Sequence, residues 1–476
     1  MISDLKPYPL MKDSGVPWLG EVPGHWQIER AKWLFRKMDR PVREQDEVVT
    51  CFRDGLVTLR KNRRIRGFTE SLKEIGYQGI RRGDLVIHAM DAFAGAIGVS
   101  DANGKGTPVY LVCEPIPRID AHYYSYTIRE MARSKWIQAL AKGIRERSTD
   151  FRFDAFGSQS VPVPPLIEQT AIVRHLDYMD WRIRKYIRAK QKLIKLLEEQ
   201  KQAIIHSTVT CGLDPNVRLK PSGIDWLGDV PEHWEVRKLG TLGIFFKGRG
   251  ISKVDITETG APAITYGEIY THYGVEAKVL SKCTSPEVAA NAQEILKGDL
   301  LFTASGETID EIGKTTLYSG DGPGYAGGDI IILRLKEGNG LYLSYTLNSS
   351  VGVQQKSAFG RGDIIVHISA TKLKQIAVPI PSQDEQIEVA RFLEQSMANI
   401  ARAVEYNRRE IDLLREYRTR LIADVVTGKL DVREMATTLP EEIDGPEVLD
   451  EVDADENGEV IMDEGEEASN IEEGET

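Results

Sequence analysis

Residues 12–28 read KDSGVPWLGEVPGHWQI, and residues 220–236 read KPSGIDWLGDVPEHWEV. At an offset of 208 residues, ten of the seventeen aligned positions are identical. We call these two segments the WLG motifs. A match of this quality within one chain indicates an internal duplication, and a duplication sets the plan of the whole fold.

Two further segment pairs extend the repeat. VPVPPLIEQTAIVRHLD, from Val161, matches VPIPSQDEQIEVARFLE, from Val378, at an offset of 217. RGDLVIH, from Arg82, matches KGDLLFT, from Lys297, more weakly at an offset of 215. Because the offset changes so little, we expect two halves that share one scaffold and have diverged in their loops and surfaces.

Each half contains strand-like and helix-like segments. Runs such as DLVIHAM and DIIILRL favour strands, whereas SKWIQALAKGIRER favours an amphipathic helix. We therefore predict an α+β (mixed α/β) globule in each half. The expected divisions are a first globule at 1–160, a long helix at 161–212, a second globule at 213–377, a second long helix at 378–432 and a tail at 433–476.

The two long helices carry the clearest periodicity. Apolar residues recur at alternating steps of four and three from Ile172 to Ile204 and from Val389 to Leu421, which is the period of a coiled coil. At ~1.5 Å per residue, a helix of about 40 residues is roughly 60 Å long. We expect the helices to separate the globules and to pair antiparallel, with Lys190 beside Asn407; two unrelated surface helices are the alternative. The residues expected to set the pairing and register are Leu176, Ile183, Lys190, Leu197, Leu393, Ile400, Asn407 and Leu414.

The charge of the chain is unevenly distributed. The 476 residues carry a formal net charge of −11, but residues 440–476 hold 17 acidic residues and neither Lys nor Arg. The remainder is therefore mildly basic, at +6. We expect the acidic, aromatic-free tail to be disordered, and the overall charge does not exclude a nucleic-acid partner.

The acidic tail matches one metal-site pattern. Asp453, Asp455, Asn457, Gly458 and Glu464 fit the calcium-loop spacing D-x-[DN]-x-[DN]-G-x5-E. A segment this rich in acid matches the pattern easily, and no clear helix flanks it. We regard the match as weak and expect no metal in this chain.

Other features bound the class of protein. No apolar run reaches the ~18–20 residues that span a bilayer, and MISDLKPYPL does not resemble a signal peptide. The four cysteines are far apart and form no CxxC pair, so we expect neither disulfides nor a zinc site and a cytoplasmic location.

Catalytic patterns fail on their context. Gly313-Lys314-Thr315 resembles the end of a phosphate-binding loop, but Thr308 stands where that motif needs its first glycine. The GxGxxG at 322–327 leads into a strand-like run rather than a helix. No [ND]PP[YF] adenine-methylation string is present. We therefore predict that this chain is not an enzyme.

Basic residues gather in one region of each half. Cations at such positions can neutralise phosphates, and arginine can also read guanine in the major groove. The alternatives are a solvated basic face in the first half and a flexible glycine-rich loop in the second. The predicted DNA-binding residues are Arg53, Arg60, Lys61, Arg63, Arg64, Arg66, Arg81 and Arg82, and then Lys247, Arg249, Lys253 and Arg361.

The WLG motifs, unlike these basic clusters, are nearly the same in both halves. His25-Trp26 recurs as His233-Trp234 in the other half. Halves that read different sequences would not need identical reading residues. The repeated pairs therefore predict a structural clasp.

The WLG motifs, the VPVPPLIEQ…LD segment and the linking run HSTVTCGLDPNV resemble the specificity subunits of type I restriction–modification systems. The resemblance covers residues 8–432, and the acidic tail lies outside it. It implies two target-recognition domains, at about 25–160 and 237–377, that each read half of a bipartite double-stranded DNA target, and conserved helices that set the spacer.

The same resemblance implies the partners. Two methyltransferase subunits would carry S-adenosylmethionine and modify adenine, and restriction subunits would use ATP and magnesium, with no cofactor on this chain. A non-DNA coiled-coil scaffold and a self-contained methyltransferase or nuclease are the alternatives from other functional classes.

Overall fold

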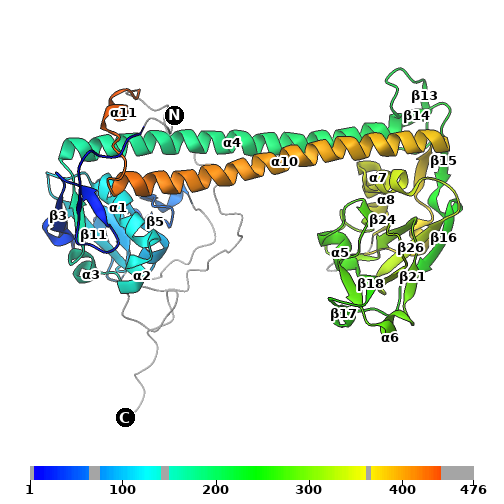
Figure 1. Cartoon of the computed structure of the whole chain (residues 1–476), viewed down its shortest axis with the longest axis horizontal. Coiled ribbons are helices and arrows are strands. Elements are labelled where there is room, and N and C mark those ends of the chain that lie inside the picture. The colour runs from blue at the N-terminus through cyan, green and yellow to red at the C-terminus, as the bar shows by residue number, and fades with distance from the viewer. Residues whose placement is uncertain (1–4, 64–74, 141–149, 361–365, 441–476) are drawn as a thin grey trace, which may run out of the picture. The chain divides into compact units, whose positions relative to one another are not determined.

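The computed structural model describes residues 5–63, 75–140, 150–360 and 366–440. Two compact units form, and each contains parts of both long helices. The first comprises residues 1–188 and 410–476, and the second comprises residues 189–409. The expected division into consecutive segments therefore differs from the compact units, because each long helix contributes one end to each unit (Figure 1).

The first unit combines small sheets with helices. Its strands are β1 (Met11–Asp13), β2 (Glu21–Pro23), β3 (Gln27–Arg30), β4 (Phe35–Lys37), β5 (Val49–Cys51), β6 (Val57–Leu59), β7 (Gln78–Ile80), β8 (Leu85–His88), β9 (Ile97–Val99), β10 (Gly104–Gly106), β11 (Tyr110–Pro115) and β12 (Ser160–Val163). Its helices are η1 (Ala31–Trp33), η2 (Arg60–Asn62), η3 (Ala92–Ala94), α1 (Ala121–Arg133), α2 (Trp136–Leu140), α3 (Phe153–Gly157) and α11 (Arg433–Thr437), with the beginning of α4 (Leu166–Cys211) and the end of α10 (Gln383–Val426).

The second unit repeats and enlarges this plan. Its strands are β13 (Leu219–Pro221), β14 (Asp229–Pro231), β15 (Glu235–Lys238), β16 (Gly243–Lys247), β17 (Ile256–Thr257), β18 (Ala261–Ile264), β19 (Glu276–Ala277), β20 (Lys282–Thr284), β21 (Gln293–Ile295), β22 (Asp299–Thr303), β23 (Ser305–Gly306), β24 (Thr315–Tyr318), β25 (Gly324–Ala326), β26 (Ile330–Leu335), β27 (Val366–His367) and β28 (Ala377–Ile380). Its own helices are η4 (Leu239–Thr241), η5 (Lys253–Asp255), α5 (Tyr266–Thr271), α6 (Pro286–Ala289), α7 (Gly340–Asn348), α8 (Ser350–Phe359) and α9 (Ala370–Leu373).

The sheet topologies agree with the predicted duplication. The first unit has a sheet of order β4-β11-β8-β9, and the second has β16-β26-β22-β24-β19. The strands β8 and β22 come from the weakly matching RGDLVIH and KGDLLFT segments. In both units a strand following the WLG motif pairs antiparallel with the strand before the long helix, as β3·β12 and β15·β28. The α+β fold class is confirmed in both halves.

Both units bury the second tryptophan of the WLG motif, the one that follows the histidine. Trp26 and Trp234 are each completely buried, and each lies beside a glycine that ends a long helix. Those glycines, Gly428 and Gly212, both have φ of +77°, a left-handed conformation that suits glycine at a helix end. A Cβ atom on Gly428 would lie 2.9 Å from the Trp26 ring, so this close approach also requires glycine.

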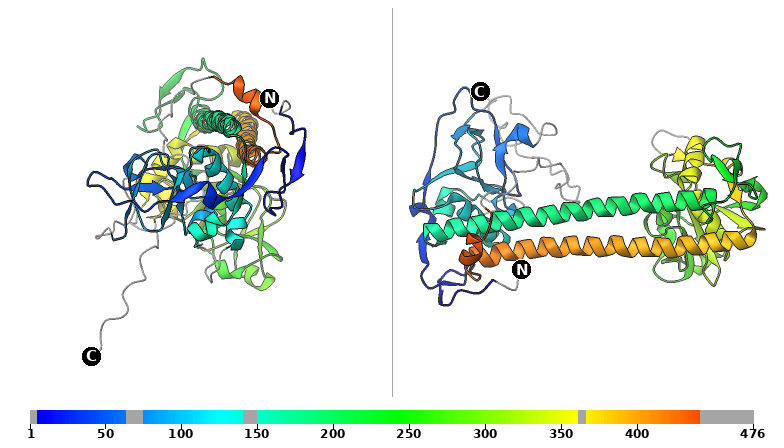
Figure 2. Two further views of the ribbon diagram at one scale, coloured as in Figure 1. Left: turned by 90° about the vertical axis from the view of Figure 1, so that its left-hand side faces the viewer. Right: turned by 90° about the horizontal axis from the view of Figure 1, so that it is seen from above.

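The long helices run side by side and antiparallel within each unit (Figure 2). In the second unit, Lys190 Nζ lies 3.3 Å from Asn407 Oδ1, so the two predicted register residues are in contact. The other predicted pairing residues Leu176, Ile183, Leu393 and Ile400 are buried, and Leu197 and Leu414 are half-buried.

The strict heptad pattern is wrong for part of α4. The steps of four and three counted from Ile172 place Tyr186, Leu193 and Gln200 in the seam, but these three residues are exposed. Ile187 and Ile205 are buried instead. The reason is that an α-helix has 3.6 residues per turn, so a strict 3.5-residue stripe drifts around the helix by ~20° per heptad unless the helices supercoil. Within the described residues, no helix has both the length and the apolar character needed to cross a membrane.

Candidate nucleic-acid interface

The first WLG motif clasps the beginning of helix α4. Glu168 lies in the first turn of α4, and its side chain is only 4% exposed. The Trp26 indole N–H donates to Glu168 Oε1 at 2.8 Å, and His25 Nε2 lies 2.8 Å from Oε2. The Tyr8 hydroxyl also donates to Oε1. One buried carboxylate therefore accepts hydrogen bonds from three aromatic side chains. These bonds fix the start of α4 against the WLG motif.

The second WLG motif forms the equivalent clasp on α10. Trp234 Nε1 donates to Glu385 Oε1 at 3.0 Å, and His233 Nε2 lies 3.0 Å from Glu385 Oε2. The Glu385 side chain is 25% exposed, and no third ring donor reaches it within the described residues. These contacts support the prediction that the repeated His-Trp pairs are a structural clasp.

The glutamine that follows each clasp glutamate ties the long helix to the globule. Gln169 accepts from the Asp120 backbone N–H at 2.8 Å, and Gln386 accepts from the Asn339 backbone N–H at 2.7 Å. Asp120 and Asn339 are in turn the N-caps of α1 and α7. Within the repeated Glu-Gln dipeptide, the glutamate therefore binds the WLG motif and the glutamine binds a helix of the globule. That helix is α1, which follows β11, in the first unit and α7, which follows β26, in the second.

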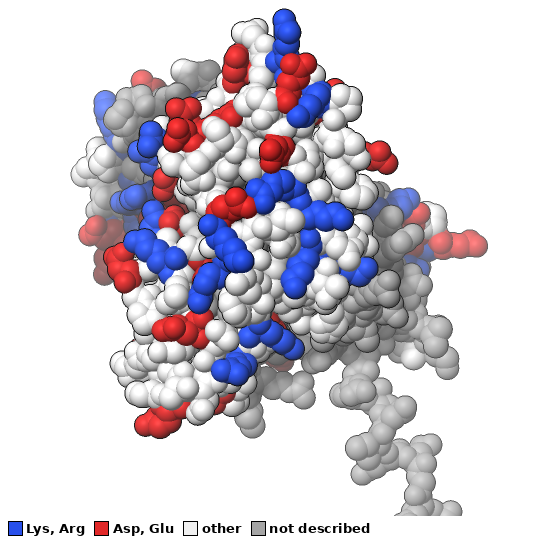
Figure 3. All heavy atoms as spheres, turned by 90° about the vertical axis from the view of Figure 1, so that its right-hand side faces the viewer, with Lys and Arg blue, Asp and Glu red and all other residues white. Residues whose placement is uncertain are grey.

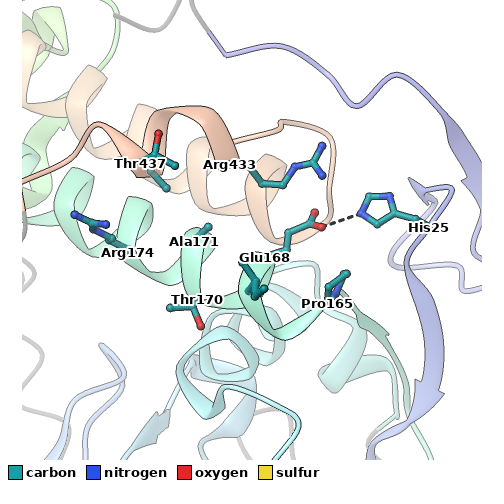
Figure 4. Close-up of a pocket in the computed structure, with 10 residues that line it drawn as sticks. His25, Pro165, Glu168, Thr170, Ala171, Arg174, Arg433 and Thr437 are labelled. Carbon is teal, nitrogen blue, oxygen red and sulfur yellow. Dashed lines mark hydrogen bonds and ion pairs between the residues drawn. The ribbon is translucent and has the colours of Figure 1, made fainter.

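The first clasp also borders a cavity of about 450 Å³. The first turns of α4 and the short helix α11 line it, with His25 and Arg433 at one side (Figure 4). Figure 4 shows the His25 ring pointing to the Glu168 carboxylate, so the clasp histidine is engaged with its partner rather than aimed into the cavity. This arrangement is that of a structural contact rather than of a catalytic pair.

The basic cluster of the first unit lies on and around the β5·β6 hairpin. Besides Arg81, which is described below, three of its cations form ion pairs with nearby acids. Arg53 pairs with Asp91 at 2.9 Å, Arg63 with Asp54 at 2.6 Å and Lys61 with Glu47 at 2.5 Å. Exposed ion pairs of this kind contribute only ~0–1 kcal/mol, so a phosphate can replace the carboxylate at low cost.

The remaining predicted residues of this unit have different surroundings. Arg60 Nε donates to Thr50 Oγ1 at 3.2 Å, and Arg82 is exposed. Arg63 also lies over the Phe52 ring at 4.5 Å. Arg64 and Arg66 lie outside the described residues.

Arg81 does not share the exposed position that the sequence suggested. Its side chain is 16% exposed and pairs with buried Asp46 at 3.1 Å. It also donates to the carbonyl of Gly104 in the neighbouring strand β10. These partners are far from Arg81 in sequence, so the run of basic residues could not reveal them. The geometry gives Arg81 a structural role.

The predicted cations of the second unit are placed differently from those of the first. Lys247 ends strand β16, Arg249 follows it, and Lys253 begins η5. All three are exposed, and none of them forms an ion pair within the described part of the chain. Arg361 lies outside the described residues. Figure 3 shows one face of this unit, on which basic side chains are interspersed with acidic ones.

Possible metal ligands are scattered rather than grouped. Within the residues that the structure describes, no group of three or more His, Cys, Asp or Glu side chains could hold a metal ion. The calcium-loop match at Asp453, Asp455, Asn457 and Glu464 lies outside the described residues.

Comparison with known protein families identifies the architecture. Residues 231–405, which contain most of the second globule and the first half of α10, match the model of the type I restriction modification DNA specificity domain. This part of the chain is therefore similar to a type I DNA specificity domain. The matched domain is one of DNA specificity rather than catalysis, in agreement with the prediction that this chain is not an enzyme.

Relatives of the specificity-subunit family cover most of the chain. A protein assigned as the type I restriction enzyme MjaX specificity subunit of Methanocaldococcus jannaschii is 22% identical over 448 residues, covering 87% of this chain and 96% of the relative. The type I restriction enzyme MjaVIII specificity subunit of the same organism is 24% identical over 321 residues, covering 66% and 70%.

Solved structures share the fold of this chain. A chain from a study of complex assembly and conformational transition of the type I R-M system has a TM-score of 0.61 at 16% identity, covering 85% of this chain and 98% of that chain. The HsdS subunit from Thermoanaerobacter tengcongensis has a TM-score of 0.53 at 16% identity, covering 86% and 98%.

Several polar residues of this chain were not identified from the sequence. Glu168 and Glu385 stood in the repeated segments, so their repetition was a usable signal, but only the structure pairs them with His-Trp. Burial lowers the pKa of His175 to about 4, and neither ring nitrogen has a hydrogen-bond partner among the described residues. Burial also lowers the pKa of Lys356 to about 7, and its Nζ donates to the Gly313 carbonyl at 2.7 Å. Nothing in the sequence pattern marked these two residues.

Proposed function

We propose that this chain is the DNA-recognition subunit of a type I restriction–modification complex and that each globule reads one half of a bipartite target. The observation that carries the proposal is the repeated clasp. The same His-Trp-Glu contact fixes both long helices, whereas the residues offered to DNA differ between the units. A structural contact that is repeated in both halves, combined with surfaces that differ, suits a protein that reads two different DNA sequences.

The proposed reading surfaces are the β5·β6 hairpin in the first unit and the segment after β16 in the second. The cations would supply affinity through phosphate contacts, and a few side chains would supply specificity at base edges. Arg63 and Lys247 represent the two kinds of surface, one paired with an acid and one without an ion pair in the described residues. The major groove admits a two-stranded β-ribbon, and the β5·β6 hairpin is an element of this kind.

The partners proposed for the complex are those that the resemblance to type I specificity subunits implies. Methyltransferase subunits would bind S-adenosylmethionine and modify adenine, and restriction subunits would use ATP and magnesium. This chain would hold none of these cofactors. Its two paired helices would fix the separation of the half-sites and provide a surface for the methyltransferase subunits.

Selection from a randomised DNA library tests the proposal directly. The purified chain, alone and with its methyltransferase, is mixed with duplexes that contain two random blocks separated by spacers of varied length. We expect enrichment of a sequence in each block at one preferred spacing. Binding without sequence enrichment would support the scaffold alternative, and methylation or cleavage by the chain alone would support the self-contained enzyme.

Matched variants distinguish the two reading surfaces. Lys247→Ala with Arg249→Ala should weaken selection at one half-site and leave the other half-site sequence unchanged. Lys192→Ala with Lys195→Ala provides the control, because both lysines are exposed on α4 and belong to neither proposed surface. Loss of enrichment in both blocks by the first variant, with a normal control, would contradict independent reading.

A further inference from the structure

A partly exposed row of aromatic and basic side chains lies on helix α4 in the first unit. Its members are Tyr178, Trp181, Arg182, Lys185 and Tyr186, and we call this row the aromatic–basic patch. Positions three and four apart lie on the same side of an α-helix, so these residues form one continuous stripe. None of them belongs to the clasp or to the predicted DNA-binding residues.

The patch combines ring faces with cations. Lys185 Nζ lies 4.9 Å from the centre of the Trp181 ring, and the Arg182 guanidinium lies 5.6 Å from the Tyr178 ring and 6.0 Å from the Tyr186 ring. Lys185 is exposed, and Tyr186 is 52% exposed. Because Lys185 is exposed, its ammonium group also faces solvent, from which an anion can approach it. The patch is therefore suited to a ligand with both carboxylates and apolar groups.

The acidic residues next to the patch are engaged with other groups. The Tyr126 hydroxyl donates to Asp177 Oδ1 at 2.7 Å. Asp180 pairs with Arg184 at 2.8 Å and also with Arg418. These contacts direct the two neighbouring carboxylates to groups of the first unit, so they do not serve as the anionic partners of Lys185.

The structure brings the beginning of the acidic segment to this patch. Arg174 lies one helical turn before Tyr178 and donates to the carbonyls of Leu439 at 2.7 Å and Pro440 at 3.1 Å. Leu439 and Pro440 also line a small cavity together with Tyr178. The chain that continues from Pro440 therefore starts within one turn of the patch.

The sequence after Pro440 has the matching chemistry. Residues 441–476 contain 17 acidic residues and neither Lys nor Arg, and they begin Glu-Glu-Ile-Asp. Carboxylates in this segment complement Arg182 and Lys185, and the Ile443 side chain complements the exposed rings. We propose that the acidic segment after Pro440 docks on the aromatic–basic patch of α4 as an intramolecular polyanion.

Attachment to the same chain makes such docking effective. A short connection gives an effective concentration of roughly millimolar, so even a weak contact is well populated. Because the groups are near the surface, salt should weaken the contact strongly. A docked segment would exclude other polyanions from this part of α4. Docking of this kind is independent of the proposed function, since it involves contacts within one chain.

Carbodiimide cross-linking of the full-length chain tests the docking. The reagent activates a carboxylate, the lysine amine attacks it, and an amide bond forms as the urea by-product leaves. At low salt we expect amide links from Lys185 to residues 441–476 to exceed those from Lys32 and Lys37, which are exposed on other elements of the first unit. Links spread evenly over the three lysines would overturn the proposal.

Cleavage by a glutamate-specific protease provides a second readout on the full-length chain. We expect the sites at Glu441 and Glu442 to be protected at low salt. The Arg182→Ala, Lys185→Ala variant should be cleaved at least about threefold faster, as expected for removal of a modest surface interaction. The Lys192→Ala, Lys195→Ala control should behave as the native chain.

The same variants distinguish docking from a nucleic-acid role for the patch. Unchanged cleavage in the Arg182→Ala, Lys185→Ala variant would overturn the proposal. If that variant also bound duplex DNA more weakly than the control, the patch would be a DNA surface instead. Melting curves that match the native chain establish that the variants remain folded.

Discussion

The two clasps share a motif but differ in how completely they enclose the glutamate. Glu168 accepts from Tyr8, His25 and Trp26, and its side chain is 4% exposed, whereas Glu385 accepts from His233 and Trp234 and is 25% exposed. The difference lies in how each unit is assembled. In the second unit the chain runs directly from α4 through Gly212 to the WLG motif.

The first unit instead joins segments from distant parts of the sequence. The Asp431 backbone N–H donates to the Lys6 carbonyl at 2.8 Å, and Arg433 lies 5.1 Å from the Tyr8 ring centre. These contacts replace the covalent link that the second unit has at the same place. We therefore expect the clasp to contribute more to the stability of the first unit, where the segments are not linked covalently, than to that of the second.

The largest predicted effect follows from removing each glutamate. Glu168→Ala leaves two buried ring donors without an acceptor and should destabilise the first unit by ~3 kcal/mol, whereas Glu385→Ala should cost the second unit ~1–2 kcal/mol. Hydrogen exchange followed peptide by peptide in urea measures each unit separately. Glu388→Ala, on the exposed side of α10, is the control. Equal losses from the two clasp variants would contradict the comparison.

A second contrast concerns acid sensitivity. His175 is buried with a pKa of about 4, and the aligned position in the second half is Phe392, which does not titrate. The unfolded histidine titrates near ~6.5, so between these values the unfolded state binds more protons and the first unit loses stability as pH falls. The expected loss is ~2 kcal/mol at pH 5.

The His175→Phe variant isolates this effect. We expect its first unit to show a flatter dependence of unfolding free energy on pH between 6.5 and 4 than the native chain. Unit-resolved hydrogen exchange at several pH values provides the measurement. An identical pH dependence in the variant would show that His175 does not carry the sensitivity.

A buried lysine produces a contrast at higher pH. The pKa of Lys356 is lowered to about 7, whereas an unfolded lysine titrates near ~10.4. Between these values the unfolded state again binds more protons, so the stability of the second unit rises with pH from 7 toward 10. Lys356→Met should remove this slope and stabilise the second unit at pH 7 by ~1–2 kcal/mol. A less stable variant with the native slope would refute the assignment.

The smallest expected effect compares the two proposed DNA surfaces. Lys247→Ala with Arg249→Ala should reduce the log–log salt slope of binding by ~0.9 for each phosphate that the protein no longer neutralises. Arg53→Ala with Arg63→Ala should change affinity less, because each arginine gives up an acidic partner when it binds phosphate. Fluorescence titrations at several salt concentrations measure both. A larger decrease in affinity for the Arg53 and Arg63 pair would reverse the comparison.

The sequence predicted the duplicated scaffold better than it predicted the surfaces. Repetition revealed the two halves, the α+β class and the contact between Lys190 and Asn407, because each depends on a pattern that persists along the chain. The inward position of Arg81 depends on Asp46, 35 residues away, and no local pattern encodes that partner. The seam of α4 drifted from a strict heptad for a similar reason, since supercoiling depends on the partner helix.

The clasp was predicted less completely than the scaffold but better than the surfaces. Its histidine and tryptophan were identified as structural from their repetition, and its glutamates stood in a second repeated segment. Only the fold brings the two segments together, across 142 residues in the first half and 151 in the second. Comparison of the repeats therefore identifies residues that are candidates for structural contacts, but it does not show which of them contact one another.

Single-molecule sequencing of adenine methylation tests the proposed recognition of a bipartite target most directly. Cells that carry the methyltransferase subunits are compared with and without this chain, and with the Lys247→Ala, Arg249→Ala variant. We predict a methylated two-part sequence that requires the chain, with the variant altering or weakening only one part. The same methylation pattern in cells without the chain would contradict DNA recognition by this subunit.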